Sequence, residues 1–378
     1  MRILVNMGTL KLGGGQNVGL NFLKGVEKLN EINHELYYIV ANKSLIHEYI
    51  SKNFSSKNYL VVSSNPYFRI FQERFNVVRF LISKRIDIIY TYFGYGNFPK
   101  KYPQVMGVAD SNLFYPEIDF WSEYSFLKRL YKRIIDKYRL SGYNSAAGLI
   151  FENMDMLMRY KSNMNGLNRV AFIKPSIYSS SEVVIQKFDN VSKKEVKGLF
   201  LCGWQLNKNI LIIPELIKKS CDSGYPLRIT ITAPLDNSKI HKRFIELCKK
   251  YNVSDRIDII GPVKKDKLSS LYMNADFVFL LSKLESFSNN IIESWYYRKP
   301  LIVSDLDWAR SICKEAAIYV NRESADDIIL KLQYYTKHVN EYNNIIKKGH
   351  LELLTYHSFI EKASLEIKFL EEVFNNVS

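Results

Sequence analysis

The sequence predicts an α/β protein made of two doubly wound parallel-sheet domains, and three observations support this fold class. The 378 residues exceed one typical domain of about 150 residues. Short apolar segments, typical of buried strands, alternate with amphipathic segments of helical period. This alternation lapses once, in a Ser-, Lys- and Asn-rich stretch at residues 178–196, which we interpret as a linker.

The first domain is predicted to span residues 1–180. Its expected strands lie at residues 2–7, 35–40, 59–63, 86–92, 104–108, 147–151 and 170–173, and its expected helices at 16–29, 45–52, 68–84 and 124–140. Strands that alternate with helices in this way indicate a Rossmann-like parallel sheet that is covered on both faces.

The second Rossmann-like domain is predicted at residues 196–350, and a long amphipathic segment follows at 351–378. Its expected strands lie at residues 198–202, 227–232, 257–260, 275–280 and 301–303, and its expected helices at 211–220, 240–251, 265–274 and 291–297. Ligands of such sheets bind at the carboxyl ends of the strands, so we expect the site in the cleft between the two domains.

Composition excludes several classes of protein. A hydrophobic fraction of 47% excludes wholesale disorder, and no apolar stretch reaches the 18 residues or so that cross a bilayer. Four cysteines without a CxxC pair favour neither a disulfide framework nor a zinc site, so a cytoplasmic location is expected. The six histidines form no ligand-spaced cluster, and no metal or other cofactor is predicted.

The charge balance favours anionic partners. Lys and Arg number 53 against 38 Asp and Glu, which gives +15. Nucleic acid, an anionic membrane surface and phosphorylated small molecules all fit this charge, and composition does not choose among them.

The segment at 124–140 is both basic and amphipathic. Its basic residues are Lys128, Arg129, Lys132, Arg133, Lys137 and Arg139, and its apolar residues are Phe126, Leu127, Leu130, Ile134 and Tyr138. Two interpretations stay open: a helix on an anionic membrane leaflet, at the inner face of the cytoplasmic membrane, or a surface helix whose apolar side packs in the core.

The segment at 281–305 carries the clearest signal for chemistry. Glu285 and Glu293 stand eight residues apart around the start of a predicted helix, which has small polar residues at 286 and 288–290. Unpaired N–H groups and the macrodipole at such a helix start favour a phosphate, whereas carboxylates suit sugar hydroxyls. Together they fit a nucleotide sugar; the alternative is that both carboxylates only favour the helix start.

This segment resembles the E-x7-E signature of retaining, GT-B-fold glycosyltransferases of the family 4 type, and the resemblance covers most of the second domain. It implies that Glu285 contacts the transferred sugar and that Glu293 contacts the ribose. Further donor-binding positions implied by the resemblance are Phe287, Ser288, Asn289, Asn290, Val263 and Gly203. The resemblance also implies that residues 351–378 cross back to the first domain.

The sequence departs from that family at two places. The family's diphosphate clamp is G-R-x4-K, but here Gly203 and Lys208 enclose Trp204 and Gln205, with no arginine and one residue fewer. Either Lys208 alone holds the diphosphate, or another base such as Lys264 or Arg243 compensates; the alternative is that Lys208 is a solvated loop lysine.

The acceptor side of the first domain carries the second departure. The family's histidine is absent from residues 107–112, where Asp110 remains. Asp110 is a candidate acceptor-side base, and the alternative is that it caps the next turn with Ser111. The glycines Gly13, Gly14 and Gly15 resemble the family's acceptor-side loop, and they also fit a plain strand-to-helix turn.

By this resemblance the chain is expected to transfer a sugar from a nucleotide-diphosphate sugar to a glycan or lipid-linked acceptor in bacterial surface polysaccharide or lipopolysaccharide synthesis. Two alternatives stay open. The first is a nucleotide-sugar epimerase or hydrolase of the same fold. The second is a non-catalytic basic protein that binds glycan or nucleic acid, although no RNA-binding motif is present.

Overall fold

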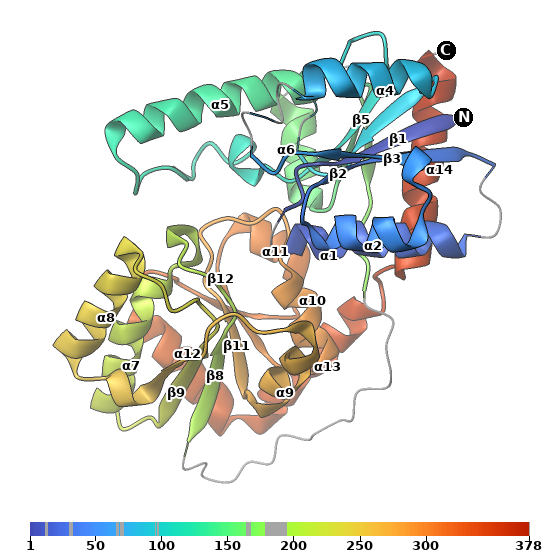
Figure 1. Cartoon of the computed structure of the whole chain (residues 1–378). Helices are drawn as coiled ribbons and strands as arrows, with labels where there is room; N and C mark the ends of the chain where they lie inside the picture. Colours follow the sequence, from blue (N-terminus) through green and yellow to red (C-terminus); the bar gives the residue numbers. More distant parts are fainter. Residues whose placement is uncertain are drawn as a thin grey trace. The chain divides into compact units, whose positions relative to one another are not determined.

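A computed structural model describes residues 1–11, 14–29, 33–65, 68, 72–94, 96, 98–163, 168–177 and 195–377. The chain divides into two compact units, which are described separately (Figure 1). Unit 1 comprises Met1–Ser179 and Tyr356–Ser378, and unit 2 comprises Ser180–Thr355. The predicted linker falls almost wholly outside the described residues.

In the described part of unit 1, seven parallel strands form one sheet in the order β3-β2-β1-β4-β5-β6-β7. The strands are β1 (Arg2–Met7), β2 (Glu35–Ala41), β3 (Tyr59–Val62), β4 (Ile88–Thr91), β5 (Gln104–Val108), β6 (Gly148–Phe151) and β7 (Arg169–Phe172). In the inner strand β1, Ile3 pairs with Leu36 on one side and with Ile88 on the other. The near-continuous apolar strands are typical of a parallel sheet buried on both faces.

The helices of unit 1 are α1 (Gly14–Lys28), α2 (Leu45–Asn53), α4 (Val78–Ser83), α5 (Phe126–Ser145), α6 (Met154–Asn163) and α14 (Phe359–Val377). A π-helix, η2 (Glu73–Val77), precedes α4, so the helix expected at 68–84 is regular only in part. Short 3-10 turns in the described part of unit 1 include η1 (Ser56–Asn58) and η3 (Ser111–Leu113).

The final helix α14 belongs to the core of unit 1, where it packs against α1. The close approach occurs at Gly25, where an added Cβ would lie 2.4 Å from the carbonyl oxygen of Phe359. Helix α5 behaves differently, because its apolar side is exposed. The interpretation that packs the apolar side of this helix in the core is therefore wrong.

In the described part of unit 2, six parallel strands form a sheet in the order β10-β9-β8-β11-β12-β13. The strands are β8 (Val196–Phe200), β9 (Leu227–Ile231), β10 (Ile257–Ile259), β11 (Phe277–Leu280), β12 (Leu301–Ser304) and β13 (Ile318–Val320). Strand order reverses between the neighbours β8 and β11, so the loops that follow these two strands meet at one edge of the sheet.

The helices of unit 2 are α7 (Ile213–Asp222), α8 (Lys239–Tyr251), α9 (Lys265–Asn274), α10 (Asn289–Tyr296), α11 (Asp307–Cys313), α12 (Ala325–Lys337) and α13 (Val339–Leu353). Its 3-10 turns are η4 (Leu206–Lys208), η5 (Ile210–Ile212) and η6 (Ser254–Arg256). The predicted fold class of two parallel-sheet α/β domains is thus confirmed.

Candidate functional site

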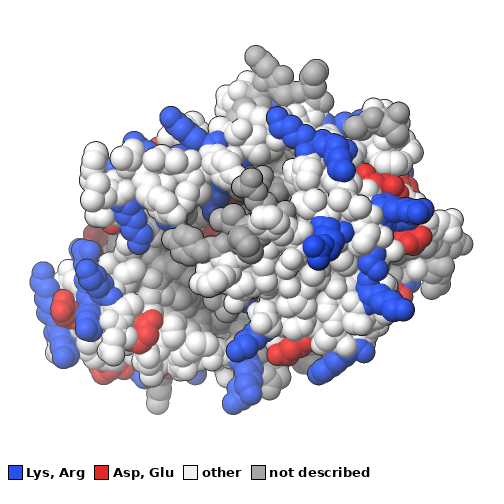
Figure 2. All heavy atoms as spheres, turned by 45° about the horizontal axis from the view of Figure 1, so that its top comes forward, with Lys and Arg blue, Asp and Glu red and all other residues white. Residues whose placement is uncertain are grey.

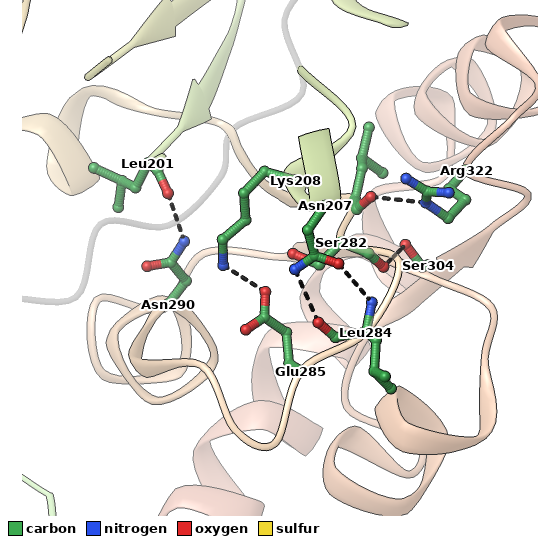
Figure 3. A network of polar contacts seen from close by, with 10 residues as sticks. Leu201, Asn207, Lys208, Ser282, Leu284, Glu285, Asn290, Ser304 and Arg322 are labelled. Atoms are coloured by element: carbon green, nitrogen blue, oxygen red, sulfur yellow. Dashed lines mark hydrogen bonds and ion pairs between the residues drawn. The ribbon is translucent and has the colours of Figure 1, made fainter. Parts of the chain in front are cut away.

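The candidate site lies where the loops after β8 and β11 meet, at the carboxyl ends of the central strands of unit 2. Lys208 comes from the first loop and Glu285 from the second, and their side chains form an ion pair (Figure 3). Lys208 is 22% exposed and Glu285 is 14% exposed, so both charges are largely withdrawn from water while remaining accessible. A cation and a carboxylate therefore stand together at the expected ligand-binding edge of the sheet.

Asn207 joins the two loops with a set of hydrogen bonds. Its side-chain amide donates to the carbonyl oxygen of Leu284 (3.0 Å) and accepts from the Leu284 N–H (3.2 Å). The main-chain carbonyl oxygen of Asn207 also accepts from the N–H of Lys283 (2.8 Å). Because Asn207 and Lys208 are adjacent, as are Leu284 and Glu285, this clamp fixes the relative placement of the two charged residues.

The other side of the β11 loop is supported by Arg322, which follows β13. Its guanidinium Nε donates to the carbonyl oxygen of Leu281 (3.0 Å), and the side chain is 9% exposed (Figure 3). Asn209, which adopts a left-handed conformation at φ 57°, donates in turn to the Arg322 carbonyl oxygen (2.5 Å). The Ser304 hydroxyl donates to the Ser282 carbonyl oxygen (2.8 Å). The loop that carries Glu285 is thus held along its length.

Helix α10 begins directly after this loop with an open N-terminus. Ser288 occupies the N-cap position in extended conformation, and its side chain makes no capping hydrogen bond. Asn290 in the first turn donates instead to the carbonyl oxygen of Leu201 (3.1 Å), which ties the helix start to the end of β8. Ser288 is buried, whereas Phe287 and Asn289 are half-buried. An uncapped helix start beside Lys208 favours an anion.

Glu293 lies one turn into α10 and pairs with a tyrosine. The fully buried Tyr272, on α9, donates to a Glu293 carboxylate oxygen (2.7 Å). Burial and the charge of Glu293 raise the pKa of Tyr272 well above its usual range, so its hydroxyl remains a donor. The tyrosine therefore orients this carboxylate.

The remaining predicted donor-side positions occupy two loops. Gly203 is half-buried, and the N–H of Gln205 donates to its carbonyl oxygen (2.9 Å). Trp204, which with Gln205 stands where the resembled motif has its arginine, is 9% exposed, stacks on His241 and donates to the carbonyl oxygen of Pro234. Val263 is half-buried in the loop after β10. Trp204 therefore packs in the core and supplies no charge to the loop that follows β8.

Asp110, the predicted acceptor-side residue, follows β5, and its side chain contacts two residues of α5. It accepts a hydrogen bond from the Tyr143 hydroxyl (2.7 Å) and pairs with Arg139 (3.1 Å). Its side chain makes no capping hydrogen bond to the turn η3, so the capping interpretation is wrong. A role of Asp110 as acceptor base stays a prediction.

The predicted glycine loop lies at the switch point of unit 1, between β1 and β4. Gly13 lies outside the described residues, Gly14 is exposed at the start of α1, and Gly15 is half-buried. The Thr9 hydroxyl, after β1, donates to the Phe93 carbonyl oxygen (2.9 Å), after β4.

Among the residues that the structure describes, no three His, Cys, Asp or Glu side chains are grouped so as to hold a metal ion.

A comparison with protein families identifies the domain that carries this site. Residues 185–351 match the model of the family "Glycosyl transferases group 1". This part of the chain is similar to the glycosyl transferases of group 1. A comparison with curated proteins finds no match.

Solved structures show the same fold over the whole chain. Sucrose-phosphate synthase from Thermosynechococcus elongatus has a TM-score of 0.73 at 13% identity and covers 100% of both chains. Anabaena HepE in complex with UDP and glucose has a TM-score of 0.69 at 12% identity, with 98% of this chain and 100% of that chain covered. WaaG, a glycosyltransferase involved in lipopolysaccharide biosynthesis, has a TM-score of 0.68 at 13% identity, with 99% of each chain covered. The predicted GT-B fold is confirmed, and the predicted glycosyltransferase class is supported.

Sequence reasoning missed three residues that build the candidate site of unit 2: Asn207, Tyr272 and Arg322. Each acts through a contact with a residue far away in the sequence, for example the 77 positions that separate Asn207 from Leu284. The one local signal was the position of Asn207 directly before Lys208.

Proposed function

We propose that this chain is a retaining glycosyltransferase of the family 4 type that moves a sugar from a nucleotide-diphosphate sugar to a glycan or lipid-linked acceptor. The reaction needs no metal ion, and its product belongs to a bacterial surface polysaccharide or lipopolysaccharide made on the cytoplasmic side of the membrane. The group 1 domain over residues 185–351 supports glycosyl transfer as the reaction class.

One observation carries the proposal: the Lys208–Glu285 ion pair stands beside the uncapped start of α10. A diphosphate needs cations and N–H donors, and a sugar needs a carboxylate that accepts from its hydroxyls. Lys208 and the first turn of α10 supply the former, and Glu285 supplies the latter. Glu293, oriented by Tyr272, would accept from the ribose hydroxyls.

The chemical task is to stabilise the charge that grows on the leaving group. The bond between the anomeric carbon and the diphosphate oxygen breaks, and the electron pair remains on the diphosphate. The acceptor hydroxyl forms the new bond on the same face of the sugar, and its proton passes to the departing diphosphate. Lys208 and the N–H groups of α10 are preorganised for that negative charge, which is usually the largest catalytic contribution.

Glu285 neutralises the charge of Lys208 in the structure. A bound diphosphate competes with Glu285 for the ammonium group. The pair leaves neither of these two largely buried charges uncompensated, and a bound diphosphate would release Glu285 toward the sugar.

A thermal-shift screen against UDP, GDP, dTDP, ADP and CMP tests donor binding. At least one nucleoside diphosphate should raise the melting temperature, because a ligand that binds only the folded form stabilises it. HepE was solved with UDP, so UDP is the first ligand to try. Lys208→Ala should weaken the affinity about tenfold or more, the scale of a lost charge-assisted contact. The control Glu285→Gln keeps the cation and should bind the diphosphate at least as tightly.

Turnover then separates transfer from the alternatives. The donor for this test is the nucleotide sugar whose nucleotide raises the melting temperature. Cleavage of this donor should require an acceptor, and Glu285→Gln should lower the rate of cleavage. Equal release without acceptor would favour a hydrolase, and no response to any nucleotide would contradict the proposed site.

A further inference from the structure

Helix α5 carries its apolar side chains on the side that faces water. The exposed fractions run from 50% at Leu130 to 78% at Phe126, and Tyr143 alone is buried on this helix. We call the exposed set the apolar stripe: Phe126, Leu127, Leu130, Tyr131, Ile134 and Tyr138. Their spacing of four residues places them along one side of the helix.

The opposite side of α5 is polar and is anchored by directional contacts. Asp136 accepts from the amide of Asn112 (2.9 Å) and from the indole N–H of Trp121 (2.5 Å). Near the end of the helix, Tyr143 and Arg139 both contact Asp110. These contacts fix the rotation of the helix about its axis, and this rotation turns the stripe outward.

Cations border the stripe. Arg133 and Lys137 are exposed beside it, while Lys128 lies 4.4 Å from the Tyr124 ring and Lys132 lies 5.0 Å from the Trp121 ring. The helix has six basic residues, and its one acidic residue, Asp136, is used in the inner contacts. Figure 2 shows that Lys and Arg predominate over Asp and Glu on the face of the molecule that it displays.

The stripe ends at a basic hollow. Tyr138 is its last residue and also lines a cavity of about 580 Å³, to which Lys100, Lys101 and Tyr102 contribute from the segment before β5. Exposed lysines at 100 and 101 thus extend the positive charge beyond the helix.

We propose that the apolar stripe of α5 docks on an anionic phospholipid bilayer, with the stripe at the level of the headgroups and the surrounding cations against the lipid phosphates. An outward apolar side flanked by lysine and arginine is the physical signature of an interfacial helix. Tyr124, just before the helix, has an amphipathic ring of the kind that favours this interface. Among the described residues, no helix combines the length and the apolar character that crossing a bilayer requires.

Charge decides between this occupant and two others. A second copy of α5 would bring two strongly basic helices together, and like charges across an interface are costly. A nucleic acid would satisfy the cations but would leave the apolar stripe in water. An anionic bilayer pairs with the cations and also buries the apolar stripe. This proposal does not depend on the proposed sugar transfer.

Sedimentation with vesicles tests the docking on the whole chain. The protein should bind vesicles of phosphatidylglycerol and phosphatidylcholine (3:7) and should bind pure phosphatidylcholine at least about tenfold more weakly, with affinity falling as salt rises. The double variant Leu130→Glu/Ile134→Glu should lose about tenfold or more of that affinity, since each side chain no longer buries apolar area. Its matched control is Leu330→Glu/Leu351→Glu, at exposed leucines on α12 and α13, which adds the same charge elsewhere.

Equal loss in both double variants would show that added charge, and not the stripe, controls binding, and would overturn the proposal. Equal binding to neutral and anionic vesicles would also overturn it. A dimer in size-exclusion chromatography that Leu130→Glu/Ile134→Glu dissolves, without vesicle binding by the parent, would assign the stripe to a second copy. Tight, salt-sensitive binding to an oligonucleotide without vesicle binding would assign the cations to nucleic acid. Circular dichroism establishes that each variant is folded.

Discussion

Two long amphipathic helices of unit 1, α5 and α14, turn their apolar sides in opposite directions. In α14 the apolar residues Ala363, Ile367, Leu370 and Val373 are buried in the core. In α5, six large apolar side chains are exposed and the inner side is polar. In the sequence, both helices carry apolar residues along one side. This pattern alone therefore does not determine whether that side faces the core or the solvent.

The difference follows from what each helix meets. Helix α14 lies against α1 and the sheet, where Gly25 lets the backbones approach closely. Helix α5 meets polar partners at the ends of strands, among them Asp110 after β5. Burial of apolar area therefore stabilises α14 within unit 1, whereas directional hydrogen bonds place α5 and leave its stripe for another partner.

The largest expected effect comes from matched leucines on the two helices. Leu370→Ala, at a side chain with 0% exposure, should lower the free energy of unfolding of unit 1 by about 2–5 kcal/mol, because it leaves a cavity. Leu130→Ala, at a side chain that is 50% exposed, should change it by no more than about 0.5 kcal/mol. Urea denaturation, followed by hydrogen exchange in β1 and β4, measures both. Similar losses for the two variants would show that the stripe of α5 is packed in the folded protein.

The second prediction concerns the charges that α14 takes into the core. Lys362 is 3% exposed and pairs with Glu152 (2.5 Å), while Glu366 is 2% exposed and accepts from the hydroxyls of Tyr90 (3.1 Å) and Tyr92 (3.4 Å). Lys362 and Glu152 balance each other, so an ionised Glu366 adds an unbalanced buried charge. Burial accordingly raises the pKa of Glu366 to about 7, against the attraction of Lys362.

The sign of the pH dependence follows from this raised pKa. Between about pH 4.5 and 7 the folded protein keeps Glu366 protonated, whereas the unfolded chain ionises it. The folded state therefore binds one proton more than the unfolded chain in this range. The free energy of unfolding should fall as the pH rises from about 4.5 to about 7, by at most about 3 kcal/mol. Glu366→Gln should remove this contribution, while the exposed control Glu372→Gln should retain it. Parallel pH profiles for the parent and Glu366→Gln would contradict the assignment.

The sequence predicted elements whose pattern is local, and it failed where distant partners decide. Residues 265–274 were predicted as a helix and form α9 with the same bounds, and the two parallel sheets follow from strand and helix alternation. Glu285 is predicted from its place at a polar helix start and Lys208 from a resemblance, and the switch point between β8 and β11 brings the two together. Tyr272 and Arg322 had no local signal, because their partners lie 21 and 41 positions away.

The smallest expected effect tests the polar anchor of α5. Tyr143→Phe removes the hydroxyl that donates to Asp110 and keeps the buried ring, so it should lower the free energy of unfolding of unit 1 by about 1 kcal/mol. Burial and the charge of Asp110 raise the pKa of Tyr143 well above its usual range, so the hydroxyl remains a donor and the loss should be the same at pH 6 and pH 9. Vesicle affinity should stay within about twofold of the parent, because Phe126 to Tyr138 are unchanged and Arg139 still pairs with Asp110. A Tyr143→Phe protein that keeps its stability but loses vesicle binding would show that this contact orients the stripe without stabilising the fold, and the distinction between an anchored α5 and a packed α14 would need a different physical basis.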